Sequence, residues 1–291
     1  MKILLVAPSF YPRVGGVEKY VFNIAIRLNK EYNNDIIIVT TSTNSRKSRL
    51  KKHNTVIKEL SIDDAQIKVY KLVFHVKMYS TPIGLSWYTI MKKIILREKP
   101  DIINAHIPVP YLSDIAIYLA KKCGIPSILT YHNDVTGETF SKKFIAKSYY
   151  ALMGYRTLCV VDSIVSTSKI YAYRSPYLRR FLNKVRVIPP GIDEKFLKAY
   201  CNEKIRDRLG IPQNCNIILF VGRLDNYARF KGLDDLLMAF KLIQYLKRRI
   251  LLLIIGKGNY RYYYEFLSQS LGLKEKVRFE GFVKEDLLSY Y

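Results

Sequence analysis

A glycine, an arginine and a lysine follow one predicted strand at a spacing that suits a diphosphate. The apolar run Asn216–Val221 predicts a buried strand, and Gly222 and Arg223 come directly after it. Lys231 follows a short loop, and the next glycine opens a predicted helix. A glycine admits close backbone approach, an arginine binds two oxygens at once, and a lysine and a helix N-terminus add positive charge. The alternative interpretation is a plain strand-to-helix loop with solvated basic residues.

Two further glycine pairs stand just after predicted strands. Gly15 and Gly16 follow the first strand and precede a helix, and Gly256 and Gly258 follow a strand of the second half. Such glycines allow a tight turn and let phosphate or hydroxyl groups approach backbone N–H groups. The spacing does not match the Gly-x-Gly-x-x-Gly fingerprint of nicotinamide enzymes. A purely structural turn is the alternative at both places.

Two histidines also follow predicted strands. His132 comes after the strand Ser127–Tyr131, and His106 comes after the strand Ile102–Ala105. Open α/β sheets bind ligands at the carboxyl ends of their strands. A histidine there can hydrogen-bond a sugar hydroxyl or transfer a proton, although an ordinary loop histidine is the alternative.

Several other kinds of site find no support in the sequence. We find no nucleophile elbow with a Ser-His-Asp order, no Gly-x-x-x-x-Gly-Lys-Ser/Thr loop and no carboxylate cluster suited to magnesium. The four cysteines are scattered singly, which argues against a zinc site or a disulfide framework. Hydrolase, P-loop and metal-dependent interpretations therefore lose support.

The composition is that of a globular protein with a strong excess of positive charge. Apolar residues make up 49% of the 291 residues and charged residues 25%. The net charge is +24, and most of it falls on residues 1–192. Such a field attracts nucleic acid, anionic lipid or a phosphorylated substrate, unless it reflects only a lysine-rich source. The N-terminal apolar run is about six residues long and stops at Pro8, so we expect a first strand and a cytoplasmic protein.

Short apolar runs alternate with helical stretches, a pattern that predicts a doubly wound α/β fold with parallel sheets. The segment Pro189–Asp193 interrupts the pattern and divides the chain into domains 1–190 and 191–291, of which we expect the second to be incomplete. The predicted strands are Ile3–Ala7, Ile36–Thr40, Ile67–Leu72, Ile102–Ala105, Ser127–Tyr131, Ser163–Thr167, Val185–Ile188, Ile217–Val221, Ile250–Ile255 and Val277–Glu280. The predicted helices are Val17–Asn29, Trp87–Glu98, Leu112–Cys123, Phe140–Leu158, Leu233–Leu246 and Tyr262–Leu271, with the start of a last one in Lys284–Tyr291.

The predicted helix Phe140–Leu158 is both basic and aromatic. Lys142, Lys143 and Lys147 alternate with Phe144 and neighbouring tyrosines. Such a face suits an anionic membrane surface, and the alternative is a partly buried helix with a solvated edge.

Taken together and in this order, the motifs resemble those of the retaining glycosyltransferases of family 4, which have the GT-B fold of two Rossmann-like domains. The segments that carry the resemblance are Pro8–Pro12 with Gly15–Glu18, Lys99–His106, Thr130–His132, Val187–Asp193, Val221–Leu224 with Lys231 and Gly232, and Gly256–Gly258. They extend over essentially the whole chain.

The resemblance implies a metal-independent enzyme that moves a sugar from a nucleoside-diphosphate sugar to an acceptor and keeps the anomeric configuration. Arg223 and Lys231 match the pair that binds the donor diphosphate and stabilises the leaving group. Gly15, Gly16, Gly256 and Gly258 fall on the donor side, His132 lies near the transferred sugar, and His106 is placed on the acceptor side. The acceptor, a glycan precursor or a lipid-linked one, would bind the N-terminal domain.

By the same resemblance we expect no cofactor and no nucleic acid partner, and peripheral contact with an anionic membrane. Two departures from the family pattern stand out. Residues 226–229 lengthen the loop between Arg223 and Lys231, and the paired glutamates of the family belong beyond Tyr291. We therefore expect this form to be weakly active. One alternative is a sugar-nucleotide 2-epimerase, although Pro8–Gly16 of this chain does not match the loop with which such epimerases usually open. The other alternative is a basic binding protein without catalysis.

Overall fold

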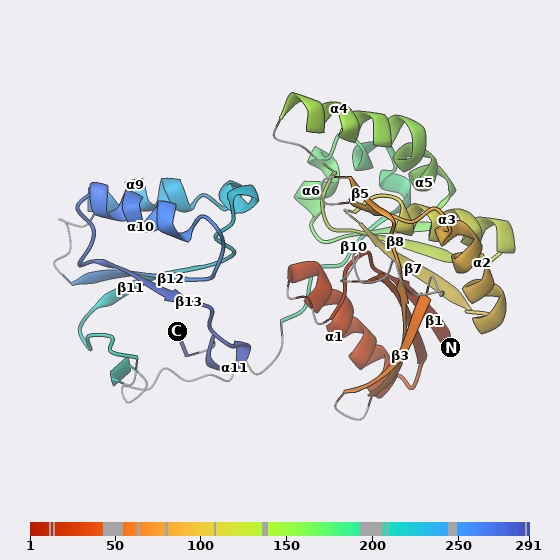
Figure 1. Cartoon of the computed structure of the whole chain (residues 1–291), viewed down its shortest axis with the longest axis horizontal. Helices are drawn as coiled ribbons and strands as arrows, with labels where there is room; N and C mark the ends of the chain where they lie inside the picture. The colour runs from red at the N-terminus through yellow and green to blue at the C-terminus, as the bar shows by residue number, and fades with distance from the viewer. Residues whose placement is uncertain are drawn as a thin grey trace. The chain divides into compact units, whose positions relative to one another are not determined.

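The computed structural model shows two compact units, Met1–Pro190 (unit 1) and Gly191–Tyr291 (unit 2) (Figure 1). It describes residues 1–11, 13, 15–42, 55–62, 65–78, 81–107, 109–135, 139–192, 206–207, 209–243, 249–288 and 290–291. In the described part of the chain, no helix combines the length and the apolar character that crossing a membrane requires.

Unit 1 is built on an eight-stranded sheet in the order β10-β9-β8-β7-β1-β2-β4-β3. Neighbouring strands are parallel except β3 and β4, which are antiparallel. The strands are β1 (Lys2–Val6), β2 (Asp35–Thr41), β3 (Thr55–Ile62), β4 (Ala65–Leu72), β7 (Ile102–Ile107), β8 (Ser127–Tyr131), β9 (Ser163–Ser166) and β10 (Val185–Val187). The seven predicted strands of this unit are confirmed, and the edge strand β3 was missed.

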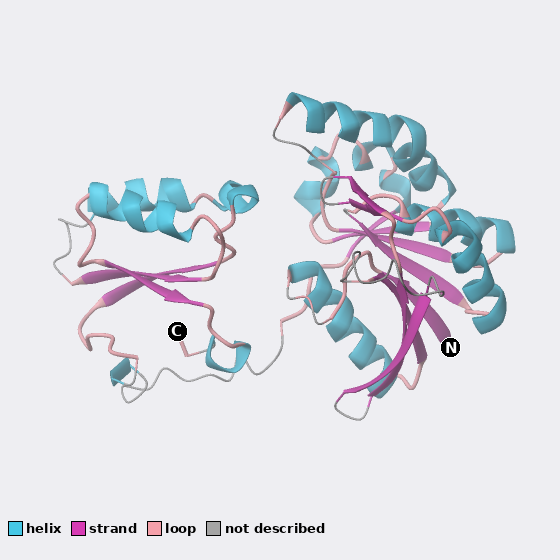
Figure 2. Ribbon diagram, viewed as in Figure 1, coloured by secondary structure: helices cyan, strands magenta, loops and turns pink. Residues whose placement is uncertain are grey.

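The helices of unit 1 cover both faces of the sheet (Figure 2). Leu4 and Val6 of β1 share a core with α2 and α3, whereas Ile3 and Leu5 share one with α1. This alternation confirms the doubly wound prediction, because successive strand residues point to opposite faces. The helices are α1 (Gly16–Lys30), α2 (Trp87–Glu98), α3 (Leu112–Cys123), α4 (Phe140–Tyr149), α5 (Tyr155–Val160) and α6 (Lys169–Arg174), with 3₁₀ turns at Leu178–Arg180 and Leu182–Lys184. A short hairpin of β5 (Val76–Met78) and β6 (Thr81–Ile83) was not predicted.

The helix predicted at Phe140–Leu158 is one helical segment with a π-helical turn, Tyr150–Gly154, between α4 and α5. The Tyr149 hydroxyl donates to Asp114, and the Tyr150 hydroxyl is hydrogen-bonded to that of Tyr131. A Cβ at Gly154 would lie 2.8 Å from the Tyr150 ring and 3.0 Å from the Tyr149 ring. The glycine therefore makes room for two consecutive tyrosines that both bond toward the interior.

Unit 2 holds a parallel three-stranded sheet in the order β11-β12-β13. Leu237 and Phe240 of α9 and Tyr264 of α10 pack on Leu252 and Ile254 of β12, so both helices cover the same face of the sheet (Figure 1). The elements are β11 (Asn216–Val221), a 3₁₀ helix (Asn226–Lys231), α9 (Leu233–Ile243), β12 (Ile250–Ile255), α10 (Arg261–Ser270), β13 (Val277–Gly281) and α11 (Glu285–Leu288). The last residues predicted for α9, 244–246, lie outside the described part.

Candidate functional site

The loops after β11 and β12 lie side by side in unit 2. The two strands are parallel and paired up to Val221 and Ile255, so their carboxyl ends adjoin. The Gly222 N–H then donates to the Ile255 carbonyl at 2.9 Å, and the Leu224 N–H donates to the Lys257 carbonyl at 3.1 Å. The sheet register thus brings the predicted Arg223 loop against the predicted glycine loop at Gly256–Gly258.

Gly256 and Gly258 are needed for this close approach. A Cβ at Gly256 would lie 1.7 Å from the Gly222 carbonyl oxygen, and one at Gly258 would lie 2.1 Å from the carbonyl carbon of Leu224. Gly256 also has a φ of +152°, which residues with side chains rarely adopt. The packing of the two loops accounts for both glycines. Their contact with a donor stays a prediction.

Asp225 binds one edge of the Arg223 guanidinium, and the Tyr227 ring lies against its face. Its Nε and Nη2 atoms each lie 2.8 Å from Asp225 Oδ2, and its Cζ lies 5.1 Å from the centre of the Tyr227 ring. Although burial raises the pKa of Asp225, hydrogen bonds from Tyr227, Asn259 and Arg223 hold that pKa below its ordinary value. Asp225 is therefore charged at neutral pH, and among the described residues no hydrogen bond or ion pair engages the Nη1 atom of the guanidinium. The Arg223 side chain is 57% exposed.

Lys231 lies over the glycine that precedes Arg223. Its Nζ is 3.2 Å from the place where a Cβ of Gly222 would be, and its Cδ is 3.1 Å from that place. Within the described ranges, no carboxylate lies at ion-pair distance from the Lys231 ammonium group. The extra residues 226–229 fold into the 3₁₀ helix Asn226–Lys231, which returns Lys231 to the loop. Gly222 thus has the Lys231 ammonium group beside it and is followed directly by Arg223.

The N-terminus of α9 differs from the expectation. Asp234 and Asp235 occupy its first turn, where their charge already balances the helix dipole. Asp234 in turn accepts a hydrogen bond from the Tyr263 hydroxyl at 2.8 Å and pairs with Arg229 at 3.3 Å. An anion at this terminus would meet two carboxylates, so the terminus is a weaker anion site than the sequence suggested.

In unit 1 the two predicted histidines form a pair. His106 Nδ1 lies 3.3 Å from His132 Nε2, and the rings stack with their planes 19° apart. The expectation that His106 follows a strand is wrong, because β7 continues to Ile107 and includes it. His106 is fully buried and therefore cannot contact an acceptor directly in this structure. Its role on the acceptor side stays a prediction, and any such effect would have to pass through His132.

Both histidines are neutral at physiological pH. Burial, followed by the neighbouring His132, lowers the pKa of His106 to about 3. Burial also lowers the pKa of His132 to about 4, against the opposing effect of the Glu18 charge. Within the described part of the chain, His106 Nε2 has no hydrogen-bond partner. A neutral pair of this kind can present a hydrogen bond from His132 but carries no positive charge.

The first turns of α1 complete this cluster. The Tyr20 ring meets the His132 ring edge-on with the ring centres 5.0 Å apart, and the Glu18 carboxylate approaches the Cα of Gly15. Among the described residues, and apart from its chain neighbours and its own helix backbone, nothing lies within 4 Å of the place where a Cβ of Gly16 would be. The described atoms therefore leave room for a ligand beside Gly16, and its contact with a donor stays a prediction.

The sequence prediction missed four residues of these clusters. Glu18 lies three residues beyond Gly15 and Tyr20 lies four residues beyond Gly16, and residues at these spacings are neighbours on a helix. Asp225 and Tyr227 lie two and four residues beyond Arg223, inside a loop whose folding the sequence pattern does not predict. Among the described residues, no group of three metal-ligating side chains lies together.

Comparisons with known proteins identify the family. The profile of Glycosyltransferase Family 4 matches residues 14–196, and that of Glycosyl transferases group 1 matches residues 202–291. The O-antigen chain mannosyltransferase C of Escherichia coli is 28% identical over 78% of this chain and 55% of its own length. The D-rhamnosyltransferase WbpZ of Pseudomonas aeruginosa is 29% identical over 75% of this chain and 52% of its own. The chain thus spans about half the length of the curated relatives it matches.

A solved structure shows the same fold. Anabaena Alr3699/HepE, determined in complex with UDP, superposes with a TM-score of 0.65 at 17% identity and covers 99% of this chain and 71% of its own. This likeness supports the two-domain, Rossmann-like GT-B fold. Since the first family profile matches more than half of the sequence, the chain belongs to glycosyltransferase family 4.

Proposed function

We propose that this protein transfers a sugar from a nucleoside-diphosphate sugar to an acceptor. The placement of Lys231 over Gly222, the residue that directly precedes Arg223, carries the proposal. Arg223 keeps its Nη1 end for phosphate oxygens, and Lys231 adds a second charge that no described carboxylate neutralises. Family membership and the UDP bound to a protein of the same fold support a nucleotide-sugar donor.

The chemistry of the donor explains why two cations suit this loop. When the bond between the sugar C1 atom and the diphosphate oxygen breaks, the electron pair stays on the diphosphate, whose negative charge grows. Preorganised cations stabilise that charge more in the transition state than in the bound donor, which accelerates the step. We propose that Arg223 and Lys231 supply this stabilisation without a metal ion or other cofactor, and that the transfer retains the anomeric configuration.

We propose that unit 2 binds the donor and unit 1 the acceptor. Neutral His132 would hydrogen-bond a hydroxyl of the transferred sugar, and Gly16 offers open space for a phosphate or hydroxyl group. The O-antigen mannosyltransferase among the relatives supports an acceptor that is a glycan or a lipid-linked glycan precursor. We place the reaction in the cytoplasm, at an anionic membrane surface, with no nucleic acid partner.

Calorimetric titration of this chain with nucleoside diphosphates and the matching monophosphates tests the donor site directly. We expect a diphosphate to bind about tenfold or more tightly than its monophosphate, because the second phosphate adds charge-assisted hydrogen bonds. Equal binding of the two, or none, would contradict the proposal.

In a companion assay with nucleotide sugars, release of free nucleoside diphosphate indicates a transferase. An isomerised nucleotide sugar would indicate an epimerase, and salt-sensitive binding unaffected by Arg223→Ala would indicate a basic binding protein.

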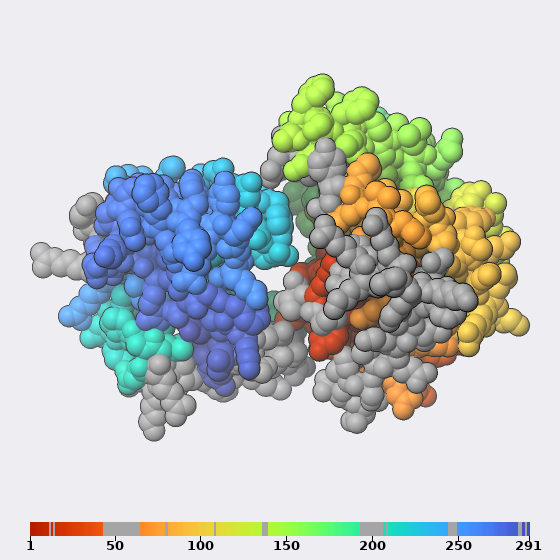
Figure 3. All heavy atoms as spheres, viewed as in Figure 1, coloured from red at the N-terminus to blue at the C-terminus, as the bar shows by residue number. Residues whose placement is uncertain are grey.

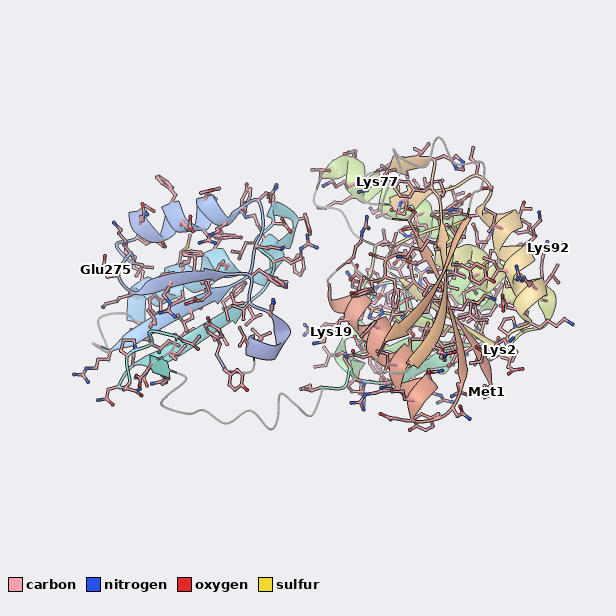
Figure 4. The ribbon with its side chains drawn as sticks, turned by 60° about the horizontal axis from the view of Figure 1, so that its bottom comes forward. Met1, Lys2, Lys19, Lys77, Lys92 and Glu275 are labelled. Carbon is pink, nitrogen blue, oxygen red and sulfur yellow. The ribbon has the colours of Figure 1, made fainter. Side chains whose placement is uncertain are left out.

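We expect Asp225→Asn to weaken nucleoside-diphosphate binding about tenfold. The substitution keeps the shape of the side chain but removes the charge that holds the Nε–Nη2 edge of Arg223, so the long side chain must be ordered by the ligand instead. Glu275→Gln is the matched control, because Glu275 is exposed in the loop before β13, away from the carboxyl ends of the strands (Figure 4). If Asp225 acts through Arg223, the substitution has little further effect in an Arg223→Ala background. Full additivity of the two losses would contradict that role.

A further inference from the structure

The pairing of β7 with β8 brings the two histidines of unit 1 together. His106 lies opposite Thr130 in this ladder, and His132 follows two residues further on, so both side chains point to the same face of the sheet. The His132 N–H donates to the Ile107 carbonyl at 3.4 Å, and Ser113 Oγ donates to the His106 carbonyl at 2.6 Å. The backbone of both histidines is therefore held in place.

The His106 ring lies inside unit 1. β7 is a central strand of the sheet, and helices such as α2 and α4 form part of the surface of the unit (Figure 3). Ala105 and Ile107 pack into the core on the side of α2 and α3, so the His106 ring lies on the other side, with the centre of the Tyr20 ring 6.0 Å away. Water therefore cannot reach the His106 ring, and its hydrogen-bond partners must be protein groups.

The two rings meet nitrogen to nitrogen. His106 Nδ1 lies 3.3 Å from His132 Nε2, and the ring centres are 5.5 Å apart, which is close to the nitrogen–nitrogen distance plus the two ring radii. The two nitrogens therefore point at each other along the line between the ring centres. A neutral histidine carries one ring proton, so a hydrogen bond forms here only when one of the two nitrogens is protonated and the other is not.

The surroundings of His106 Nε2 favour one of the two proton arrangements. If His132 donates, the proton of His106 is on Nε2, where it finds no acceptor among the described residues. If His106 donates from Nδ1, its Nε2 atom keeps only a lone pair. A buried N–H without an acceptor is rarer in proteins than an acceptor without a donor, because aliphatic C–H groups are weak partners for a lone pair but offer nothing to an N–H. The arrangement in which His106 donates is therefore the more stable one.

We propose that His106 is a positioning residue that holds His132 in the tautomer with its proton on Nδ1. His106 Nδ1–H donates to His132 Nε2, which leaves His132 Nδ1–H to donate to a ligand. Within the described ranges no hydrogen bond engages His132 Nδ1, and His132 is partly exposed. The inference deepens the proposed function and rests on it for the ligand, because a hydroxyl oxygen of the transferred sugar would accept this hydrogen bond.

Long-range proton–nitrogen NMR correlation of the whole chain, labelled with nitrogen-15 histidine, identifies the tautomers directly. The chain has four histidines, and the spectra of His106→Asn and His132→Asn assign the signals of the pair by their loss. At neutral pH we expect both histidines to have a protonated Nδ1 and a bare Nε2. A protonated Nε2 on either histidine, or equal populations of the two tautomers, would overturn the inference.

Variants of His106 test its positioning role. Leucine donates no hydrogen bond, whereas the asparagine amide can donate near the position of Nδ1. We expect His106→Leu to shift His132 toward the tautomer protonated on Nε2 and to slow release of nucleoside diphosphate from a nucleotide sugar about tenfold, as loss of one hydrogen bond does. His106→Asn should keep the His132 tautomer and restore part of the rate.

His75→Leu is the matched control, because it makes the same substitution at an exposed histidine and should change neither the rate nor the His132 signals. Circular dichroism establishes that each variant is folded. If folded His106→Leu and His106→Asn lose equal activity and leave His132 in one and the same tautomer, His106 does not position His132. The spectrum of the unchanged protein tests the tautomer even if a variant does not fold.

Titration with free nucleoside diphosphate separates this inference from the proposed function. The diphosphate lacks the sugar and would bind through Arg223 and Lys231, so its affinity should not respond to His106→Leu. If the unchanged protein fails to bind nucleoside diphosphate, the donor site is wrong, whereas the histidine tautomers are measured without any ligand. If it binds nucleoside diphosphate but carries its His106 proton on Nε2, the donor site stands and the inference about His106 alone is wrong.

Discussion

Arg223→Ala is expected to lower the rate of nucleoside-diphosphate release from the donor sugar by about 10²-fold. Removing one preorganised donor from a developing anion commonly has an effect of this size. Here the loss has a second component, because Asp225 would remain without the cation that it pairs with. Its carboxylate would then repel the diphosphate. Binding of free nucleoside diphosphate should fall less, about tenfold, because the guanidinium interacts most strongly with the charge of the transition state.

The measurement compares Arg223→Ala with Arg249→Ala in the same assay of released nucleoside diphosphate. Arg249 is exposed and directly precedes β12, at the amino end of the sheet, so it changes the net charge equally without touching the loop. Titration with nucleoside diphosphate gives the same comparison independently of turnover. Arg223→Lys should restore only part of the loss, since an ammonium group cannot bond Asp225 and phosphate oxygens in the fixed planar geometry of a guanidinium. A rate and an affinity close to those of the unchanged protein in Arg223→Ala would remove Arg223 from the donor site.

The fold was predictable wherever a strand is apolar on both faces. β1, β2 and β12 lie in the middle of their sheets, so their sequences are continuous apolar runs with turn residues at each end. β3 is an edge strand that pairs only with β4, and its apolar residues are mixed with Lys58 and Glu59. It was missed because it therefore lacks the continuous apolar run that marks a central strand. The hairpin β5–β6 was missed because strands of three residues carry no periodicity.

The site was predictable only as far as strand ends determine it. The rule that ligands lie at the carboxyl ends of parallel strands led to Arg223, Gly256 and His132, and the sheet registers bring the first two of these together. The partners of these residues depend on side-chain directions within loops, which no period encodes. The Asp225–Arg223 pair and the contact between Tyr20 and His132 are therefore visible only in the structure. The burial of His106 was missed because β7 extends past the predicted strand end.

Stability should fall steeply between neutral and mildly acidic pH because of the buried histidine pair. In the unfolded chain a histidine has a pKa near 6.5, whereas that of His106 in the folded protein is about 3. Below pH 6.5 the unfolded state therefore binds a proton that the folded state excludes. The linkage relation then gives a loss of about 1.4 kcal/mol per pH unit from this group, which continues down to about pH 3. His132, with a pKa of about 4, acts in the same direction.

Urea unfolding at several pH values between 7 and 5, with and without His106→Asn, measures this contribution. Asparagine cannot titrate but keeps a polar atom near the position of Nδ1, so the variant should lose about one proton of pH dependence whatever its stability at pH 7. Comparing slopes cancels the other titrating groups, among them the buried Asp114, whose pKa is raised by burial and whose effect on the slope has the opposite sign. His75→Asn is the matched control, because it makes the same substitution at an exposed histidine. Parallel stability curves for the unchanged protein and His106→Asn would show that His106 binds its proton equally in the folded and unfolded states, which contradicts a neutral buried pair. His132 would then accept a hydrogen bond from a His106 imidazolium at mildly acidic pH, and the neutral pair proposed beside the donor sugar would be wrong.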